Sequence, residues 1–323
     1  MQFPGTLSPR RLTGVAAVAC TAALMLVASP AVTASPAAAS GSAGVDTAAM
    51  VTLAASAARP AGRVTVYVGG TGRISGQGTV TPIDAATGTA LKRITVGGNG
   101  GVIAVTPDGK IAYVHSSVDS APGTVTPIEV ATGTALKPIT VGSGPGPIAI
   151  TPDGKIAYVV NSSSSTVTPI RTATNTALAA IPASSPVAIA ITPDGKTAYV
   201  VDNRPNHRQG GITPIDTATS PVGKPIRVGR FPTAIAITPD GETAYVISIG
   251  PHTVTPIDTA TNTALKRINV GDIPQALAIT PDGETAYVVS LAPGLVTPIN
   301  TATNTALAAI DVQGLPAYLA ITP

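Results

Sequence analysis

The stretch that decides the fold is "TPDGKIAYVV", residues 151–160. Near copies of it begin at Thr106, Thr192, Thr238 and Thr280, at intervals of 41 to 46 residues. Such a period is typical of repeat architectures, in which each unit is one supersecondary element that stacks on its neighbours. A residue that recurs at the same place in every unit is explained first by the geometry of the unit.

Each repeat contains four short β-rich segments. An "IAIT"-like segment comes first, "TAYV" second, "VTPI" third and an "ITV"-like segment fourth. Val, Ile, Thr and Tyr favour strands. "PDG" joins the first two segments and "DTATNT" joins the last two, and both are turn sequences. The third segment recurs six times, beginning at Val80, Val125, Val167, Ile212, Val254 and Val296.

Four antiparallel strands at this period predict an all-β chain, a β-propeller of repeated four-stranded blades. Six copies of each segment favour six blades, and seven blades remain possible if residues near Val45 contribute strands. The chain enters at a second-type strand (residues 64–68) and its last strand is of the first type (residues 319–322). We therefore expect the C-terminal strand to pair with the first blade and close the ring, which would remove an open edge.

These repeats resemble the YVTN β-propeller family. The resemblance rests on "TPDGKIAYVVN" (residues 151–161) and "VTPIDTATNTALKRINVG" (residues 254–271) and covers residues 64–323. It implies a secreted or surface-exposed propeller, commonly of seven blades, from a family whose members mostly have no known activity. The proline in every third segment is a departure, because proline cannot donate to a strand ladder. We expect strand pairing to be interrupted there, with a bulge as one possibility.

Two recurring side chains are interpreted as scaffold. The aspartates of "PDG" are expected to stabilise turns, and the tyrosines of the second segment are expected to pack between blades. The aspartates are Asp108, Asp153, Asp194, Asp240 and Asp282, and the tyrosines are Tyr67, Tyr113, Tyr158, Tyr199, Tyr245 and Tyr287.

The N-terminal region predicts export. Arg10 and Arg11 precede an apolar run at residues 15–27, so residues 1–39 are interpreted as a signal peptide. Residues 40–63 are interpreted as a linker rich in Ala, Ser and Gly, although "VDTAAMVTLAA" from Val45 echoes the repeat's "DTATNTAL". Removal of the signal peptide would remove Cys20, the only cysteine, and leave 17 basic and 16 acidic residues. We expect a secreted protein with no disulfide, no membrane span and no general attraction to nucleic acid.

Candidate binding residues lie where the repeats differ, on the face that carries the loops between the second and third strands and between successive repeats. "VDNRPNHRQGG" (residues 201–211) is the most polar of these loops, and "GRFPTA" (residues 229–234) is expected on the same face. Guanidinium groups bind carboxylate or phosphate. Tyr318 precedes the last strand and could sit at the mouth of the central channel. The predicted binding residues are Asn203, Arg204, His207, Arg208, Arg230, Phe231 and Tyr318.

No catalytic motif was found, and we predict no catalytic residue, no cofactor and no metal site. His115, His207 and His252 come from separate repeats without carboxylate support, which is a poor metal signature. The leading function is a monomeric, secreted binding propeller for an unidentified protein or a small polar or anionic ligand. One alternative is a lactonase-like hydrolase or lyase that uses a divalent metal. Another is anion or nucleic-acid binding through Arg204, Arg208 and Arg230, against which the near-neutral charge and the lack of Trp argue.

Overall fold

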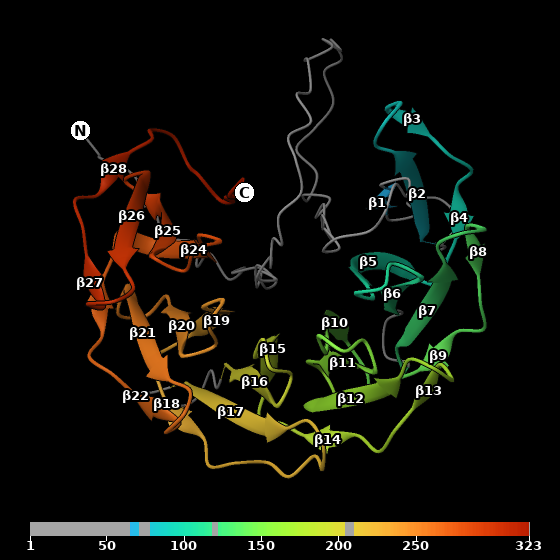
Figure 1. The fold of residues 1–323 in the computed structure, drawn as a ribbon, viewed down its shortest axis with the longest axis horizontal. Coiled ribbons are helices and arrows are strands. Elements are labelled where there is room, and N and C mark those ends of the chain that lie inside the picture. The colour runs from blue at the N-terminus through green and yellow to red at the C-terminus, as the bar shows by residue number, and fades with distance from the viewer. Residues whose placement is uncertain (1–64, 71–77, 118–121, 204–209, 323) are drawn as a thin grey trace, which may run out of the picture.

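The computed structural model describes residues 65–70, 78–117, 122–203 and 210–322, and these residues form six antiparallel sheets arranged as an arc (Figure 1). None of them lies in a helix, so none belongs to a helix long and apolar enough to cross a membrane. The predicted all-β propeller of repeated blades is confirmed. The predicted signal peptide and linker lie outside the described residues.

Inner strands line the arc in five of the six sheets (Figure 1). They are β5 (Asn99–Val105), β10 (Pro145–Ile150), β15 (Pro186–Ile191), β19 (Pro232–Ile237) and β24 (Asp272–Ile279). Second strands, which carry the recurring tyrosine, are β1 (Thr65–Gly70), β6 (Ile111–Ser117), β11 (Ile156–Asn161), β16 (Thr197–Asp202), β20 (Thr243–Ser248) and β25 (Thr285–Ala292). Within the described residues, the first sheet begins with a second strand, β1, as the sequence predicted.

Third and outer strands complete each sheet. The third strands are β2 (Thr79–Asp84), β7 (Thr124–Glu129), β12 (Thr166–Arg171), β17 (Gly211–Asp216), β21 (Thr253–Asp258) and β26 (Leu295–Asn300). The outer strand is divided into two-residue pieces: β3 (Thr89–Ala90), β4 (Ile94–Thr95), β8 (Thr134–Ala135), β9 (Ile139–Thr140), β13 (Thr176–Ala177), β14 (Ile181–Pro182), β18 (Ile226–Arg227), β22 (Thr263–Ala264), β23 (Ile268–Asn269), β27 (Thr305–Ala306) and β28 (Ile310–Asp311).

The recurring proline explains why the outer strand is divided. Pro169 in β12 lies opposite Tyr158, and the β11–β12 register runs without interruption on that side. On the other side, β13 and β14 pair only with the two ends of β12. The expected interruption of strand pairing is therefore confirmed, and it lies on the side of the outer strand. The bulges lie elsewhere, in the inner strands, for example between Pro145 and Ile148.

Among the described residues, the core consists of five apolar clusters, one between each pair of successive sheets. In one of them, Tyr199 and Ile212 of the fourth sheet meet Val246 and Ile257 of the fifth, and all four are 0% exposed. The other four clusters repeat the same arrangement. Stability therefore comes from face-to-face packing of neighbouring sheets, as expected for stacked repeats.

The predicted ring closure is not seen among the described residues. Residues 312–322 contain no strand, and no strand pairing is formed by residues 319–322 with the described part of the first sheet. The first and sixth sheets stand apart at the two ends of the arc (Figure 1). The closure by the C-terminal strand, and the choice between six and seven blades, stay predictions.

Candidate functional site

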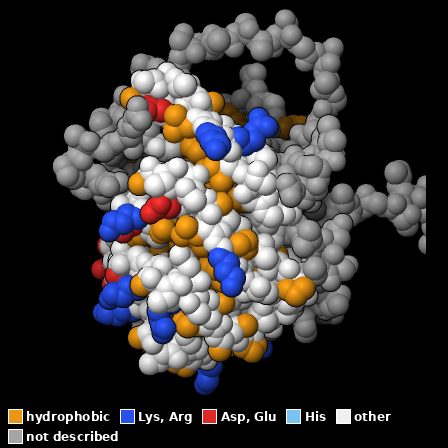
Figure 2. Space-filling view, turned by 90° about the vertical axis from the view of Figure 1, so that its right-hand side faces the viewer, with side chains coloured by type: hydrophobic (Ala, Val, Ile, Leu, Met, Phe, Trp, Pro, Cys, Tyr) orange, Lys and Arg blue, Asp and Glu red, His pale blue; other side chains and the backbone are white. Residues whose placement is uncertain are grey.

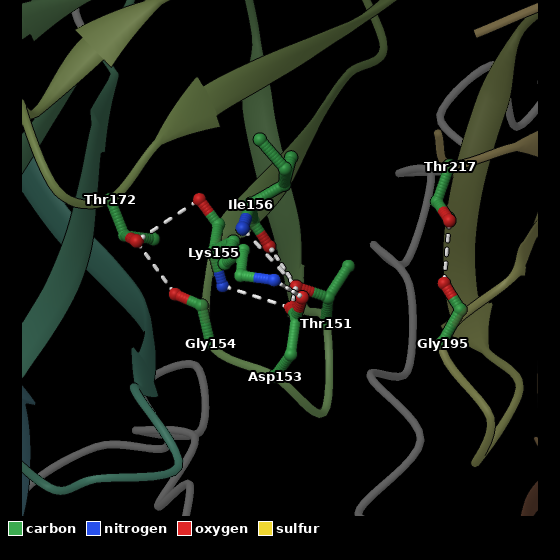
Figure 3. A network of polar contacts seen from close by, with 8 residues as sticks. All are labelled: Thr151, Asp153, Gly154, Lys155, Ile156, Thr172, Gly195 and Thr217. Atoms are coloured by element: carbon green, nitrogen blue, oxygen red, sulfur yellow. Dashed lines mark hydrogen bonds and ion pairs between the residues drawn. The ribbon is translucent and has the colours of Figure 1, made fainter. Parts of the chain in front are cut away.

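One face of the arc carries a turn network that recurs in the second to sixth sheets. Thr151 Oγ1 donates to Asp153 Oδ1 at 2.6 Å and accepts from the backbone N–H of Ile156 at 3.1 Å (Figure 3). Asp153 Oδ1 also accepts from the backbone N–H of Lys155 at 3.0 Å. These hydrogen bonds, first that from Thr151, lower the pKa of Asp153 to about 2. The prediction that these aspartates stabilise turns is confirmed.

A threonine from the outer turn of the same sheet, which joins the third strand to the outer strand, hydrogen-bonds to this network. Thr172 Oγ1 donates to the carbonyl of Gly154 at 2.6 Å, and Thr217 Oγ1 donates to that of Gly195 at 2.5 Å (Figure 3). Both turns therefore lie on one face, which we call the turn face. Because the turn threonine and aspartate are engaged in the second to sixth sheets, the turn face offers a ligand few unsatisfied groups.

The tyrosines join neighbouring sheets, as predicted. Tyr199 Oη lies 2.7 Å from Asn262 Oδ1 and 3.2 Å from the carbonyl of Thr259, both in the outer turn of the next sheet. Tyr245 makes the equivalent bonds to Asn304 and Thr301. Burial raises the pKa of Tyr199 to about 12. Tyr287, in the last sheet, is only partly buried, and its hydroxyl forms no hydrogen bond within the described residues.

The opposite face, which we call the loop face, changes from sheet to sheet. Each loop that enters an inner strand holds one residue with positive φ, where glycine fits best. Two sheets place large side chains there, with φ 52° at Phe231 and 54° at Ile273. A β-branched residue at positive φ is an outlier, and strained residues of this kind gather at functional sites. The equivalent residues in the second to sixth sheets are Gly98, Gly144, Ser185, Phe231 and Ile273.

Arg230 and Phe231 form one half of the candidate site. The Arg230 guanidinium carbon lies 5.1 Å from the centre of the Phe231 ring, which is a cation–π contact. Their backbone is fixed, because the Arg230 carbonyl accepts from Gly250 N–H and the Phe231 carbonyl accepts from Ile249 N–H, each at 3.0 Å. Arg230 is exposed. Its charge is therefore presented to solvent from a rigid base.

His252 and Ile273 form the other half. His252 Nδ1 accepts a hydrogen bond from Ile273 N–H at 2.9 Å and lies 3.9 Å from Asp272 Oδ1. Because Nδ1 is an acceptor here, a neutral His252 carries its proton on Nε2. The side chain of Ile273 is partly exposed. His252 belongs to the loop that also holds Gly250, so this half adjoins the Arg230–Phe231 pair.

The structure brings together only part of the predicted site. Arg230 and Phe231 lie on the loop face as predicted, whereas Arg204, His207 and Arg208 lie outside the described residues. Asn203 N–H donates to the Ser185 carbonyl at 3.0 Å, and its buried Oδ1 has no hydrogen-bond partner within the described residues. Tyr318 is 64% exposed, and nothing in the structure tests its predicted place at the channel mouth.

Three contributors to the site were not among the predicted binding residues. His252 was considered only as a metal ligand, and Asp272 and Ile273 were not considered. A sequence signal exists for Ile273: it precedes a proline at a position where the second to fourth sheets have glycine or serine.

His115 has a different role. It takes the place that Val160 and Val201 have in later sheets, and its imidazole packs so closely on Gly101 that a Cβ there would collide with it. Burial lowers the pKa of His115 to about 4. Within the described residues, no group of three or more His, Cys, Asp and Glu side chains could hold a metal ion.

Charged side chains of both signs lie on the face that Figure 2 draws. Lys and Arg side chains stand there at several separate places, with Asp and Glu side chains beside some of them (Figure 2). On this face they do not form a continuous basic stripe, which is the usual electrostatic footprint of nucleic-acid binding.

Comparison with known proteins identifies the fold. No family model matches the chain, and none of the curated proteins matches it. Hydrazine synthase from Kuenenia stuttgartiensis is similar in structure, with a TM-score of 0.63 and 22% identity over 78% of this chain and 85% of that chain. A functionally unknown protein from Desulfotomaculum acetoxidans gives 0.61 and 22%, over 74% and 80% of the two chains. A proposed 6-phosphogluconolactonase from Bacteroides uniformis gives 0.62 and 17%, over 80% and 86%. At these identities the likeness shows the β-propeller fold alone.

Proposed function

We propose that this chain is a secreted β-propeller of the YVTN repeat type that binds a partner or ligand through its loop face over the fifth and sixth sheets. One observation carries the proposal: Phe231 and Ile273 hold large apolar side chains at positive φ on that face. The repeat builds the same loops with Gly or Ser elsewhere, so the fold itself does not require these side chains. The backbone strain at Phe231 and Ile273 is not required by the fold, and strain of this kind supports a role in binding.

The chemistry of this surface favours a ligand with both a polar or anionic group and an apolar part. Arg230 offers a cation, His252 offers an N–H donor at Nε2, and Asp272 offers an acceptor. Phe231 and Ile273 add apolar area beside them. Export is part of the proposal and rests on the signal peptide predicted for residues 1–39.

Thermal unfolding in the presence of chosen probes tests the proposal, because a ligand that binds only the folded state raises the midpoint. The probes are Ca²⁺, Mn²⁺, inorganic phosphate, a polyanion, a δ-lactone and neutral sugars. A rise that is lost in Phe231→Ala and in Arg230→Ala, but kept in the turn-face variant Lys155→Ala, supports the loop-face site. A rise that all three variants keep places binding elsewhere and contradicts the proposal.

The same experiment separates the alternatives. A rise with metal and lactone that chelation or His252→Ala abolishes would favour a hydrolase. A rise with the polyanion that falls steeply with salt and is lost in Arg230→Ala would favour anion or nucleic-acid binding. If no probe shifts the midpoint, a protein partner remains the best candidate, and Arg230→Glu then serves as the control variant in binding assays.

A further inference from the structure

The outer rim of the fourth and fifth sheets carries a group of basic side chains next to the candidate site. β18 of the fourth sheet and β22 of the fifth contact each other there and lie side by side at the lower left of Figure 1. The bases belong to the segments that follow the outer turns of these two sheets, and all of them are exposed. They are Lys224, Arg227, Lys266 and Arg267, and we call them the basic rim.

One hydrogen bond shows how the two sheets bring these bases together. Arg267 Nη2 donates to the Val228 carbonyl at 3.3 Å, so a guanidinium of the fifth sheet reaches across to the fourth. Arg227 directly precedes Val228 and is exposed, whereas its neighbour Ile226 is buried. Two arginines from different sheets are therefore held at one place on the rim.

The basic rim has no acidic counterpart within the described residues. None of its four side chains forms an ion pair there. The segments that carry them, residues 222–231 and 263–271, contain no Asp or Glu. Of the acidic residues that flank these segments, Asp216 and Asp258 accept hydrogen bonds from their own turns, and Asp272 belongs to the candidate site. Because uncompensated like charges repel, the basic rim favours an anionic partner.

The repeat itself does not require these bases. Where the fifth sheet has Lys266 and Arg267, the third and sixth sheets have two alanines. Arg227 pairs with Gly211 at the end of the outer strand, and it is the only base at that position among the six sheets. The equivalent residues of the other sheets are Thr95, Thr140, Pro182, Asn269 and Asp311. The bases are therefore departures from the repeat, as Phe231 is on the loop face.

The basic rim continues into the candidate site and carries apolar side chains beside its charges. Arg230 follows Arg227 with only two residues between them, and both of these are buried. Val222 is 47% exposed and Leu265 is 40% exposed on the rim, and Phe231 is partly exposed at the loop-face end. A phosphate polymer would use only the charges of this surface. An acidic polypeptide with apolar side chains would use both the charges and the apolar area.

We propose that the partner of the loop face is an acidic polypeptide segment with apolar side chains, which binds across the basic rim and the Arg230–Phe231 pair. The inference rests on the proposed function, because one segment occupies both surfaces. The arginines bind its carboxylates, to which the planar guanidinium offers two parallel N–H donors. Its apolar side chains pack on Phe231, Leu265 and Val222.

Fluorescence anisotropy of the full chain with a labelled random copolymer of Glu and Tyr tests the inference. Lys266→Glu/Arg267→Glu should weaken binding about tenfold and reduce the slope of log affinity against log salt by about two. Lys92→Glu/Arg93→Glu is the matched control, because residues 91–94 repeat the "LKRI" of residues 265–268 on the opposite side of the arc (Figure 1). The control should change the affinity less than about twofold, since distant exposed charges are screened. Equal losses in the two double variants would show non-specific attraction to positive charge and overturn the inference.

Phe231→Ala separates a failure of this inference from a failure of the proposed function. If Phe231→Ala weakens copolymer binding and Lys266→Glu/Arg267→Glu does not, the loop face binds without the rim, and only the inference fails. If the rim variant alone weakens binding, the loop-face proposal fails, while the rim keeps its assignment to an acidic segment. If the copolymer does not bind, the inference is overturned, and binding of long-chain polyphosphate instead would assign the rim to a phosphate polymer.

Discussion

The turn face and the loop face of this propeller are built by the same repeat but treat its side chains differently. On the turn face, Thr151 donates to Asp153 and Thr172 donates to the Gly154 carbonyl, and the same arrangement recurs in other sheets. On the loop face, equivalent positions change from Gly144 to Phe231 to Ile273, and positive φ is kept throughout. The comparison shows that the repeat fixes the backbone path on both faces. Side chains vary between sheets at equivalent positions of the loop face.

The largest expected effect is a loss of stability at low pH, caused by a buried histidine inside the scaffold. His115 occupies a place that a valine has in other sheets, and burial lowers its pKa from 6.5 to about 4. The folded protein therefore binds fewer protons than the unfolded chain between these values. Stability should be highest above pH 6.5, fall as the pH decreases toward 4, and lose about 3 kcal/mol in total.

Urea unfolding at pH 7.5, 5.5 and 4 checks this expectation against His115→Val. The carboxylates contribute equally to both proteins, so the difference between the two pH curves isolates the imidazole. The variant should escape the loss that the native chain shows. Parallel curves would mean that His115 titrates normally in the folded protein.

The next effect compares the two faces directly. Thr151→Val keeps the shape of the side chain but leaves Ile156 N–H and Asp153 Oδ1 without the threonine hydroxyl, which should cost about 2 kcal/mol. Ser162→Ala on the loop face removes an exposed hydroxyl that donates to the Gly144 carbonyl, and should cost less than about 0.5 kcal/mol. Chemical denaturation of both variants measures the two costs. Equal costs would erase the distinction between a structural and a variable face.

The repeat explains why much of the fold was predictable from the sequence. The period, the "PDG" turns and the alternating Tyr and Val residues specify strands and turns locally, and neighbouring units then supply the packing. The divided outer strand was only partly predicted, because the sequence shows that Pro169 lacks an N–H but not which side of β12 that N–H would face.

The candidate site was less predictable for a physical reason. Arg230 and Phe231 were recognised by composition, but their partners come from other loops. The bond from Ile273 N–H to His252 Nδ1 joins residues 21 positions apart in two different loops. It accompanies the positive φ at Ile273. The repeat aligns Ile273 with glycine and serine positions of other sheets, but it does not show that His252 from another loop lies beside it.

A smaller effect is expected at Ile273 itself. The backbone at Ile273 has φ at 54°, which glycine adopts without the steric cost that a Cβ brings. Ile273→Gly should therefore be more stable than Ile273→Ala by about 1 kcal/mol. In most loops the order is reversed, since alanine restricts the unfolded chain. Thermal unfolding of the two variants gives the difference directly. If alanine proves the more stable, the loop relaxes out of the strained conformation and the strain argument for this site fails.

The smallest effect concerns charge on the turn face, where the repeats supply their own control. Lys155 Nζ lies 3.0 Å from Asp153 Oδ2, but both groups are largely exposed, and exposed ion pairs contribute little. The fifth and sixth sheets have Glu242 and Glu284 at the same position, and each still donates its backbone N–H to the turn aspartate at 2.9 Å. Lys155→Glu should therefore leave the free energy of unfolding within about 0.5 kcal/mol of the native value. A larger loss would mean that the lysine side chain, and not the backbone N–H, holds the turn, and that the five turns are not equivalent.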